Sequence, residues 1–446
     1  MPTTNSSLHK RMGIVALTWP IFIEVLLRTA LNTSDVFMLS GYSDKAVSAV
    51  GVISQLSFFL IIVSTMVSSG TSILIAQYNG AARHQESAHV GVASIILSII
   101  MGVLLSVIAI IGAQYFIPLY QLEAQVEQYA QEYLFISGAL TFNITIGIVL
   151  ATILRSHGYS KSPMVINMIA GFINVIGNYC ALYQPFGLPV YGVQGVAIAT
   201  VFSQVIGTLI LAVVVYRKGI ELPLKQYRAV PKVIYRKIVK IGSMNAGEVL
   251  SYNMAQISIM FFVVQMGTAS LAAFTYAQNI GRLSFAFALA IGQGSQIQTG
   301  YYIGKGWIDD IARRVQHYFV IGFISSLTIT CLVYLFRFEI LDLFTQDPEI
   351  IALTATLIAG SIVLEGGRVF NLIFISCLKA AGDIKFPVKM GIVSMWGVGV
   401  AMSYLLGVHW GYGVIGAWMA IAMDEWFRGI IMARRWRAKK WTRFSF

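Results

Sequence analysis

Runs of about 20 consecutive apolar residues recur along the whole chain, each long enough to cross the roughly 30 Å hydrocarbon core of a membrane as an α-helix. The runs are continuous and do not alternate with polar residues, which excludes a β-barrel. Only 11% of the 446 residues are charged and the mean hydropathy is +0.74, whereas soluble domains carry about 25% charged residues. The sequence therefore predicts an all-α polytopic membrane protein.

We expect twelve transmembrane helices, and the basic residues define their orientation. Lys and Arg gather in every second loop and in the tail "RRWRAKKWTR". The positive-inside rule then places both termini in the cytoplasm, and we expect the inner (plasma) membrane as the location. The net charge of +12 thus reflects the topology, and we expect the basic residues to contact anionic lipids. Nucleic acid is not expected as a partner. The expected spans are residues 14–41, 46–79, 88–115, 126–155, 162–183, 191–216, 236–266, 270–302, 313–336, 348–378, 386–406 and 412–433.

The chain repeats itself after 224 residues, the distance from "EVL" at 24–26 to "EVL" at 248–250. "GYSKSP" at 158–163 likewise returns as "GDIKFP" at 382–387. Six helices per repeat give two lobes of the same orientation, related by a parallel pseudo-two-fold axis. We expect an N-terminal lobe at 1–216, a cytoplasmic linker at 217–235 and a C-terminal lobe at 236–446. Parallel repeats are typical of transporters, although a channel remains an alternative.

Charges inside apolar runs are costly, so each is a functional candidate until a partner is found. Spacings of three or four residues within one helix predict three structural ion pairs. Glu248 is the repeat-mate of Glu24 but has Tyr252 where Arg28 would stand, so it is expected to lack a basic partner and to be a secondary ion site. The predicted pairs are Glu24 with Arg28, Glu365 with Arg368, and Asp424 with Arg428.

Asp35 has no basic residue within reach on its own helix, and its repeat-mate is Ile259. A carboxyl group in a low-dielectric site favours its neutral form, so it can take up and release a proton near neutral pH. Asp35 is therefore the predicted proton carrier, although its position about 30 Å along the helix from Ile14 also fits a wetted helix end. Pro20 predicts a hinge or a static kink in the same helix.

The motifs at these positions resemble those of the multidrug and toxic compound extrusion (MATE) family, and the retained acid indicates its proton-coupled, DinF-like branch. The resemblance covers essentially the whole chain. It implies two six-helix lobes that alternate between outward-open and inward-open states and export cationic or amphipathic compounds against H⁺ or Na⁺. The matching stretches are "ALTWPIFIEVLLRTALNTSDVFMLSG" at 16–41, "SAVG" at 48–51, "GTSILIAQYNGA" at 70–81, "LRSHGYSKSPMVINMIAGFINVIGNY" at 154–179 and "YGVQGVAIAT" at 191–200.

The resemblance implies specific site residues. The acid of the first helix maps onto Asp35, and an Asn and a Thr of the family map onto Asn174 and Thr200. Some members carry a second carboxylate where this chain has Asn178, which favours a one-proton site over Na⁺ binding. Asn174 and Asn178 are four residues apart and share one helix face. In the sodium-coupled branch the cation binds acids of the second lobe, so a Na⁺ site using Glu248, with Glu365 as a further candidate, remains an alternative.

The polar residues Gln55, Asn143 and Gln204, each on an apolar segment, are further candidates for the substrate and proton network. The sequence thus predicts a monomeric secondary exporter, with H⁺ as coupling ion and no cofactor. A flippase for lipids or lipid-linked sugars is the remaining alternative within transporters. An enzyme is not expected, because no catalytic motif lies on one helix face and no "GxxxxGK[ST]" occurs. The three cysteines are scattered, so no metal site is predicted.

Overall fold

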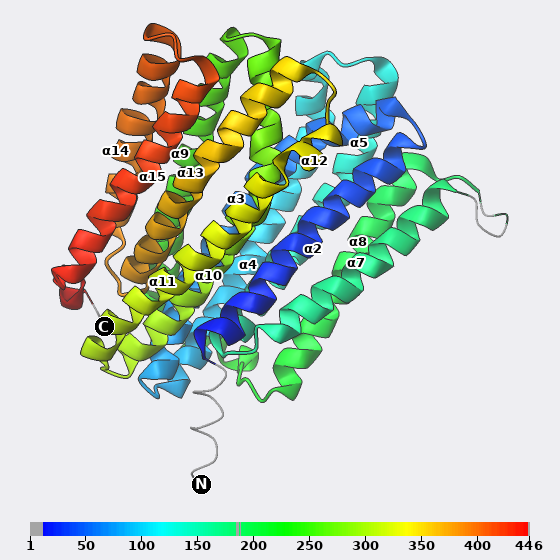
Figure 1. Ribbon diagram of the computed structural model, residues 1–446. Helices are drawn as coiled ribbons and strands as arrows, with labels where there is room; N and C mark the ends of the chain where they lie inside the picture. The colour runs from blue at the N-terminus through cyan, green and yellow to red at the C-terminus, as the bar shows by residue number, and fades with distance from the viewer. Residues whose placement is uncertain (1–11, 184–186, 188, 445–446) are drawn as a thin grey trace. The chain divides into compact units, whose positions relative to one another are not determined.

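The computed structural model describes residues 12–183, 187 and 189–444, and over these ranges the regular structure is helical with no strand (Figure 1). The first half contains α2 (Ile14–Ser40), α3 (Asp44–Gly80), α4 (His84–Ile111), α5 (Ala124–Ala139), α6 (Thr141–Ser156), α7 (Lys161–Leu182) and α8 (Gly192–Arg217). The second half contains α9 (Lys232–Gln265), α10 (Thr268–Gly304), α11 (Ile308–Leu335), α12 (Arg337–Asp342), α13 (Pro348–Ala380), α14 (Lys385–Ser394) and α15 (Gly413–Arg437). Short 3₁₀ and π segments extend or join them.

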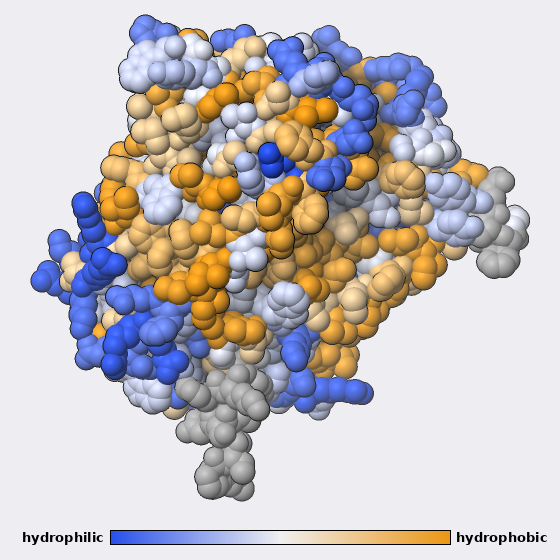
Figure 2. All heavy atoms as spheres, in the orientation of Figure 1, coloured by the Kyte–Doolittle hydropathy of each residue, from blue (hydrophilic) through white to orange (hydrophobic). Residues whose placement is uncertain are grey.

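The helices account for the expected twelve spans. Among the described residues, nine helices are long and apolar enough to cross a membrane, and α5 with α6 forms a tenth span bent by 48°. The helices α10 and α15, of 37 and 25 residues, are also long enough but carry more polar side chains. Hydrophobic residues cover the lengths of the helices on the face drawn in Figure 2, and hydrophilic ones gather near helix ends.

The chain forms two compact units whose boundaries cut through α2 and α9. Unit 1 contains Ile23–Tyr78 and Arg83–Ala246, and unit 2 contains Met12–Phe22, Asn79–Ala82 and the chain from Gly247 onward. The expected linker at 217–235 therefore lies inside unit 1, together with the first part of α9. The two cuts fall after residues 22 and 246, which are repeat-mates. Each repeat thus contributes the beginning of its first helix to the unit built by the other repeat.

These exchanged half-helices pack against glycines at repeat-related positions. In unit 2, a Cβ on Gly294 of α10 would lie 2.7 Å from Thr18 Oγ1. In unit 1, a Cβ on Gly70 of α3 would lie 2.6 Å from the carbonyl oxygen of Ile238. Gly70 and Gly294 are 224 residues apart, so both repeats use the absence of a side chain at the same position to let two helices approach closely.

Candidate functional site

Asp35 lies on α2 in unit 1, where an amide from α7 contacts it. Asn178 donates a hydrogen bond from Nδ2 to Asp35 Oδ1 at 2.6 Å. Asp35 is half-buried, and Asn178 is fully buried. No cation pairs with Asp35 in the part of the chain that the structure describes. The carboxyl group is thus held by a neutral donor alone.

The contact at Asp35 continues as a chain of polar groups. Asn174 lies one helical turn before Asn178, and the two side chains are 3.5 Å apart (Nδ2 of Asn178 to Oδ1 of Asn174). Asn174 in turn donates to Thr200 Oγ1 of α8 at 3.1 Å. Tyr133 of α5 interacts with Thr200 and with Asp35. Of these residues, Tyr133 was missed by the sequence analysis, because its segment carries no motif that separates it from other aromatic residues.

The helices that carry the polar chain at Asp35 also form an apolar cluster. It contains the buried residues Met38, Leu39, Val50 and Val196, with Tyr133 packed against it. Helices α7 and α8 lie side by side (Figure 1). The site therefore holds one carboxyl group among neutral polar and apolar side chains, a setting in which a change of its protonation has a large electrostatic effect.

The other predicted network residues lie apart from this chain. Gln55 is exposed on α3, Gln204 is half-buried on α8, and Asn143 is buried on α6. Over the described ranges none of the three is hydrogen-bonded to Asp35, Asn174, Asn178 or Thr200. Pro20 is buried, and α2 runs through it from Ile14 to Ser40 without a break.

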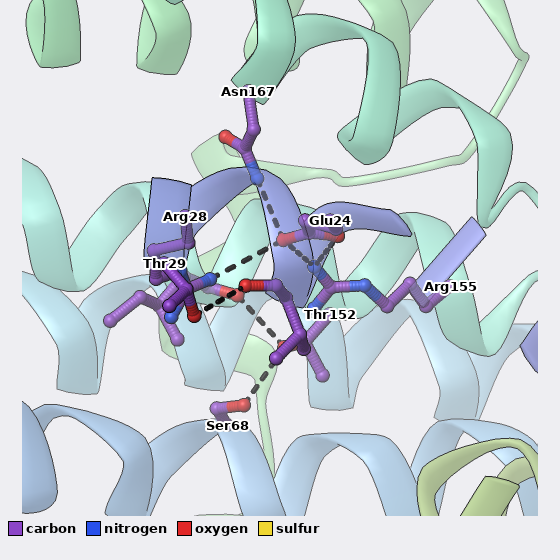
Figure 3. A network of polar contacts seen from close by, with 9 residues as sticks. Glu24, Arg28, Thr29, Ser68, Thr152, Arg155 and Asn167 are labelled. Atoms are coloured by element: carbon purple, nitrogen blue, oxygen red, sulfur yellow. Dashed lines mark hydrogen bonds and ion pairs between the residues drawn. The ribbon is translucent and has the colours of Figure 1, made fainter. Parts of the chain in front are cut away.

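Glu24 is the centre of a second network in unit 1 (Figure 3). Its carboxylate, 3% exposed, accepts hydrogen bonds from Arg155 Nη2 at 2.5 Å on both oxygens and from Asn167 Nδ2 at 2.7 Å. The predicted pair with Arg28 is present but longer, at 3.4 Å, and the Arg28 side chain is 64% exposed. Arg155 of α6 is therefore the main partner, and it is 131 residues away in the chain.

The repeat-mate Glu248 has a basic partner, so the expectation that it lacks one is wrong. Lys379 of α13 donates to Glu248 Oε2 at 2.5 Å, and both side chains are largely buried. Lys379 is the repeat-mate of Arg155, and the separation in sequence is again 131 residues. Spacing within one helix predicts only partners on that helix, and Glu248 and Lys379 lie on the different helices α9 and α13. The repeat itself held the signal, since both members of the pair recur after 224 residues.

Unit 2 contains a third network, built on α13 and α15. The predicted pairs of Glu365 with Arg368 and of Asp424 with Arg428 are both present. Glu425, which the sequence analysis missed, lies 2.9 Å from Arg428 and 4.0 Å from Arg368 and so links the two pairs. All five side chains are buried or nearly so. Three carboxyl groups therefore share two guanidinium groups.

A small pocket in unit 2 stands at the place equivalent to Asp35. It is lined by Tyr252, Gln256, Ile259 and Asp424, among others. Ile259 is the repeat-mate of Asp35, so the titratable group of the first repeat is replaced by an apolar side chain in the second. The two repeats have the same arrangement of helices but carry different polar side chains at equivalent positions.

Comparison with known proteins agrees with this geometry. The MatE family model matches residues 20–180 and 246–405, once in each repeat. The chain is 38% identical over 435 residues to the "Uncharacterized transporter YisQ" of Bacillus subtilis, covering 97% of this chain and 95% of that protein. It is 22% identical over 437 residues to the "Multidrug resistance protein NorM" of Burkholderia vietnamiensis, covering 95% and 93%.

Solved structures share the fold. The structure described as "Crystal structure of MATE in the bent conformation" superposes with a TM-score of 0.89 at 22% identity, covering 98% of both chains. The "Outward-facing conformation of a multidrug resistance MATE family transporter of the MOP superfamily" superposes with a TM-score of 0.88, also at 22% identity and 98% coverage of both chains. The chain therefore has the twelve-helix fold of these proteins.

Proposed function

The chain belongs to the MatE family of membrane transporters, and on this premise we propose that it exports organic cations and amphipathic drugs in exchange for protons. The family consists of transporters and not of enzymes. Relatives named as multidrug resistance proteins support the substrate class. The proposal includes the cell (plasma) membrane as location, cytoplasmic termini and a monomeric state.

The main support for proton coupling is the hydrogen bond between Asp35 and the side-chain amide of Asn178. The Nδ2 atom of Asn178 donates to the carboxylate at 2.6 Å, while the buried Oδ1 atom of the same side chain has no hydrogen-bond partner. An amide can donate to a carboxylate and, after rotation about its terminal bond, accept from a protonated carboxyl group. The site therefore supplies a partner for both protonation states of Asp35 without a compensating cation.

In the proposed cycle, ionised Asp35 attracts a cationic substrate from the cytoplasm. Protonation from the outside removes the negative charge and releases the substrate. One charge moved through about 100 mV is worth about 2.3 kcal/mol, which supports a roughly 50-fold concentration ratio across the membrane. That ratio is sufficient for an exporter that confers modest drug resistance.

The exchanged half-helices supply a connection between proton binding and alternating access. The part of α2 up to Phe22 belongs to unit 2, whereas Asp35 lies on the part that belongs to unit 1. Pro20 lies two residues before the boundary and removes one backbone hydrogen bond of the helix. We propose that α2 bends near Pro20 when the units move, so that occupancy of Asp35 is coupled to their arrangement.

Sodium coupling through Glu248 is the second candidate, and one observation favours it. Compared with Glu24, Glu248 has lost two donors, since Tyr252 replaces Arg28 and Gly391 replaces Asn167 at the repeat-related positions. A Cβ at position 391 would lie 3.3 Å from Glu248 Oε1, so the absence of a side chain at Gly391 leaves space beside that oxygen. A carboxylate oxygen with few donors is a suitable ligand for a hard cation.

Dye efflux from proteoliposomes tests the proposal. A pH gradient alone should drive export by the native protein, and Asp35→Asn should abolish this coupling while leaving the protein folded. Asp44→Asn is the matched control, because it removes the same charge from an exposed position of the same unit. Export driven only by a Na⁺ gradient and lost in Glu248→Gln would replace the first candidate by the second.

A further inference from the structure

The C-terminal segment after α15 folds back onto unit 2 and is fixed there. The backbone turns at Lys439, which has a φ of 50°. Trp441 then stacks on Trp436 at 4.4 Å and donates from Nε1 to the carbonyl oxygen of Trp436 at 3.0 Å. Both rings are buried. A Cβ on Gly382 would lie 2.6 Å from the carbonyl oxygen of Phe444, so the segment ends against the loop between α13 and α14.

The acidic side chains beside this segment are already paired. Asp383 accepts two hydrogen bonds from Arg435, from Nε at 2.5 Å and from Nη2 at 3.2 Å. The same guanidinium lies 4.0 Å from the centre of the Phe386 ring. Lys439 Nζ lies 2.5 Å from Asp309 Oδ1. Arg435 thus joins the end of α15 to the start of α14, and both carboxylates have a cation of their own.

Six further basic side chains at this end of unit 2 have no acidic partner. All six are exposed, and over the described residues their side chains make no hydrogen bond, ion pair or ring contact. Figure 2 shows hydrophilic side chains in the region where α15 ends in Figure 1. The six residues are Lys385 and Lys389 on α14, and Arg434, Arg437, Lys440 and Arg443 at the end of the chain.

Helices α14 and α15 pack against each other, and each carries an exposed stripe that is apolar along the span and basic at this end. On α14, Lys385 and Lys389 share one face with Val393, which is 62% exposed. On α15, three exposed apolar residues precede the basic ones at spacings of three or four. This order matches a phospholipid, whose acyl chains lie in the span and whose phosphate lies at its end. The α15 stripe consists of Met423, Phe427, Ile430, Arg434 and Arg437.

The fold of a repeat does not require these charges. When "YGVQG" of the first repeat is matched with "YGVIG" of the second, α8 carries Val213 and Tyr216 at the positions of Arg434 and Arg437. The basic end of the stripe is therefore particular to α15.

We propose that this end of unit 2 is a binding site for an anionic phospholipid, whose phosphate lies among the six basic side chains and whose acyl chains lie along the stripes of α14 and α15. Arginine and lysine bind phosphate through charge-assisted hydrogen bonds. In the proposed orientation the site faces the cytoplasmic leaflet, where clusters of basic residues beside a span bind anionic lipids. Binding of this lipid is independent of the proposed export function.

The stripes favour a lipid over a soluble phosphate compound as the source of the anion. A soluble anion would contact the cations alone, whereas a phospholipid also covers exposed apolar residues such as Val393 and Phe427. The packing of Trp441 holds the C-terminal segment in place before the lipid arrives, which lowers the cost of ordering it on binding.

The test counts lipids bound to the purified full chain by native mass spectrometry from a neutral detergent. Phosphatidylglycerol, which is anionic, is titrated in parallel with phosphatidylcholine, which has no net charge. Each basic residue near an anionic headgroup is worth roughly fivefold in affinity. The first phosphatidylglycerol should therefore bind at least about tenfold more tightly than the first phosphatidylcholine. A higher ionic strength should reduce this difference, because the basic side chains are exposed.

A triple variant removes part of the site. Lys389→Gln with Arg434→Gln and Arg437→Gln should weaken the first phosphatidylglycerol by at least about tenfold and leave phosphatidylcholine unchanged. All three side chains are exposed, so circular dichroism should show the native helix content. If the triple variant does not fold, Lys389→Gln alone should still weaken the first phosphatidylglycerol by roughly fivefold.

The matched control removes three basic residues from unit 1. Lys225→Gln with Arg228→Gln and Lys232→Gln changes exposed positions between α8 and the start of α9, and it should keep the preference for phosphatidylglycerol. Equal affinity of the native chain for both lipids, an equal loss in the control, or no loss in the variants of α14 and α15 would overturn the inference. So would displacement of the bound lipid by glycerol phosphate at the concentration at which phosphatidylglycerol binds, since the site would then recognise a soluble anion.

Discussion

Replacing Arg155 by Gln should destabilise the protein strongly, because Glu24 depends on it. The Glu24 carboxylate is 3% exposed and takes two of its hydrogen bonds from Arg155. Removing one partner of a buried ion pair leaves an uncompensated charge and typically costs about 3–5 kcal/mol. Asn167 remains as a neutral donor, so we expect a loss at the lower end, about 3 kcal/mol in the free energy of unfolding.

Arg28→Gln is the matched comparison on the same carboxylate. Its contact with Glu24 is 3.4 Å long and its side chain is 64% exposed, so solvent screens the interaction and the expected loss is below about 1 kcal/mol. Glu24→Gln combined with Arg155→Gln should recover most of the stability, because no charge then remains buried without a partner.

The assay is reversible unfolding of the purified chain in mixed detergent micelles, followed by helical circular dichroism. The native chain, Arg155→Gln, Glu24→Gln and the double variant form one double-mutant cycle, and Arg28→Gln is measured beside them. The reasoning would be refuted by an Arg155→Gln variant no less stable than Arg28→Gln. It would also be refuted by a double variant as unstable as Arg155→Gln alone.

Three further changes test other contacts. Lys379→Met should lower the free energy of unfolding by about 3 kcal/mol and Glu248→Gln should rescue it; an unaffected single variant would show that the pair is dispensable. Gly294→Val should lower the free energy of unfolding by about 1–3 kcal/mol, because the new side chain would overpack against the exchanged half-helix of α2. The melting temperature should fall, and an unchanged melting temperature would contradict the close packing of α10 against α2. Trp441→Ala removes a fully buried ring stacked on Trp436 at 4.4 Å and should cost about 3–5 kcal/mol; a melting temperature within error of the native value would contradict that packing.

The residues around Asp35 illustrate how much of the site could be predicted. Asp35 was identified because a charge without a cation on its own helix is visible in the sequence. Asn174, Asn178 and Thr200 followed from the motifs, and the structure brings them together with Asp35. Tyr133 could not be selected, since an aromatic residue on a half-polar helix has many possible environments, and only helix packing places it beside Thr200.

The ion pairs show the same limit more clearly. Pairs within one helix, such as Asp424 with Arg428, follow from spacing because the helix geometry is known. Pairs between helices do not, and Glu425 was overlooked because its role as a link exists only when α13 and α15 lie side by side.

The sequence by itself determined the membrane-spanning helices, their repeat and the positions of the charged residues within them, because run length, charge distribution and residue identity are local properties of the chain. Only the tertiary structure decided which cations neutralise Glu24 and Glu248, and that the beginnings of α2 and α9 pack in exchanged units. The physical reason is distance along the chain. Partners 131 residues apart meet only after the helices have packed, and a buried carboxylate accepts whichever cation that packing brings within reach.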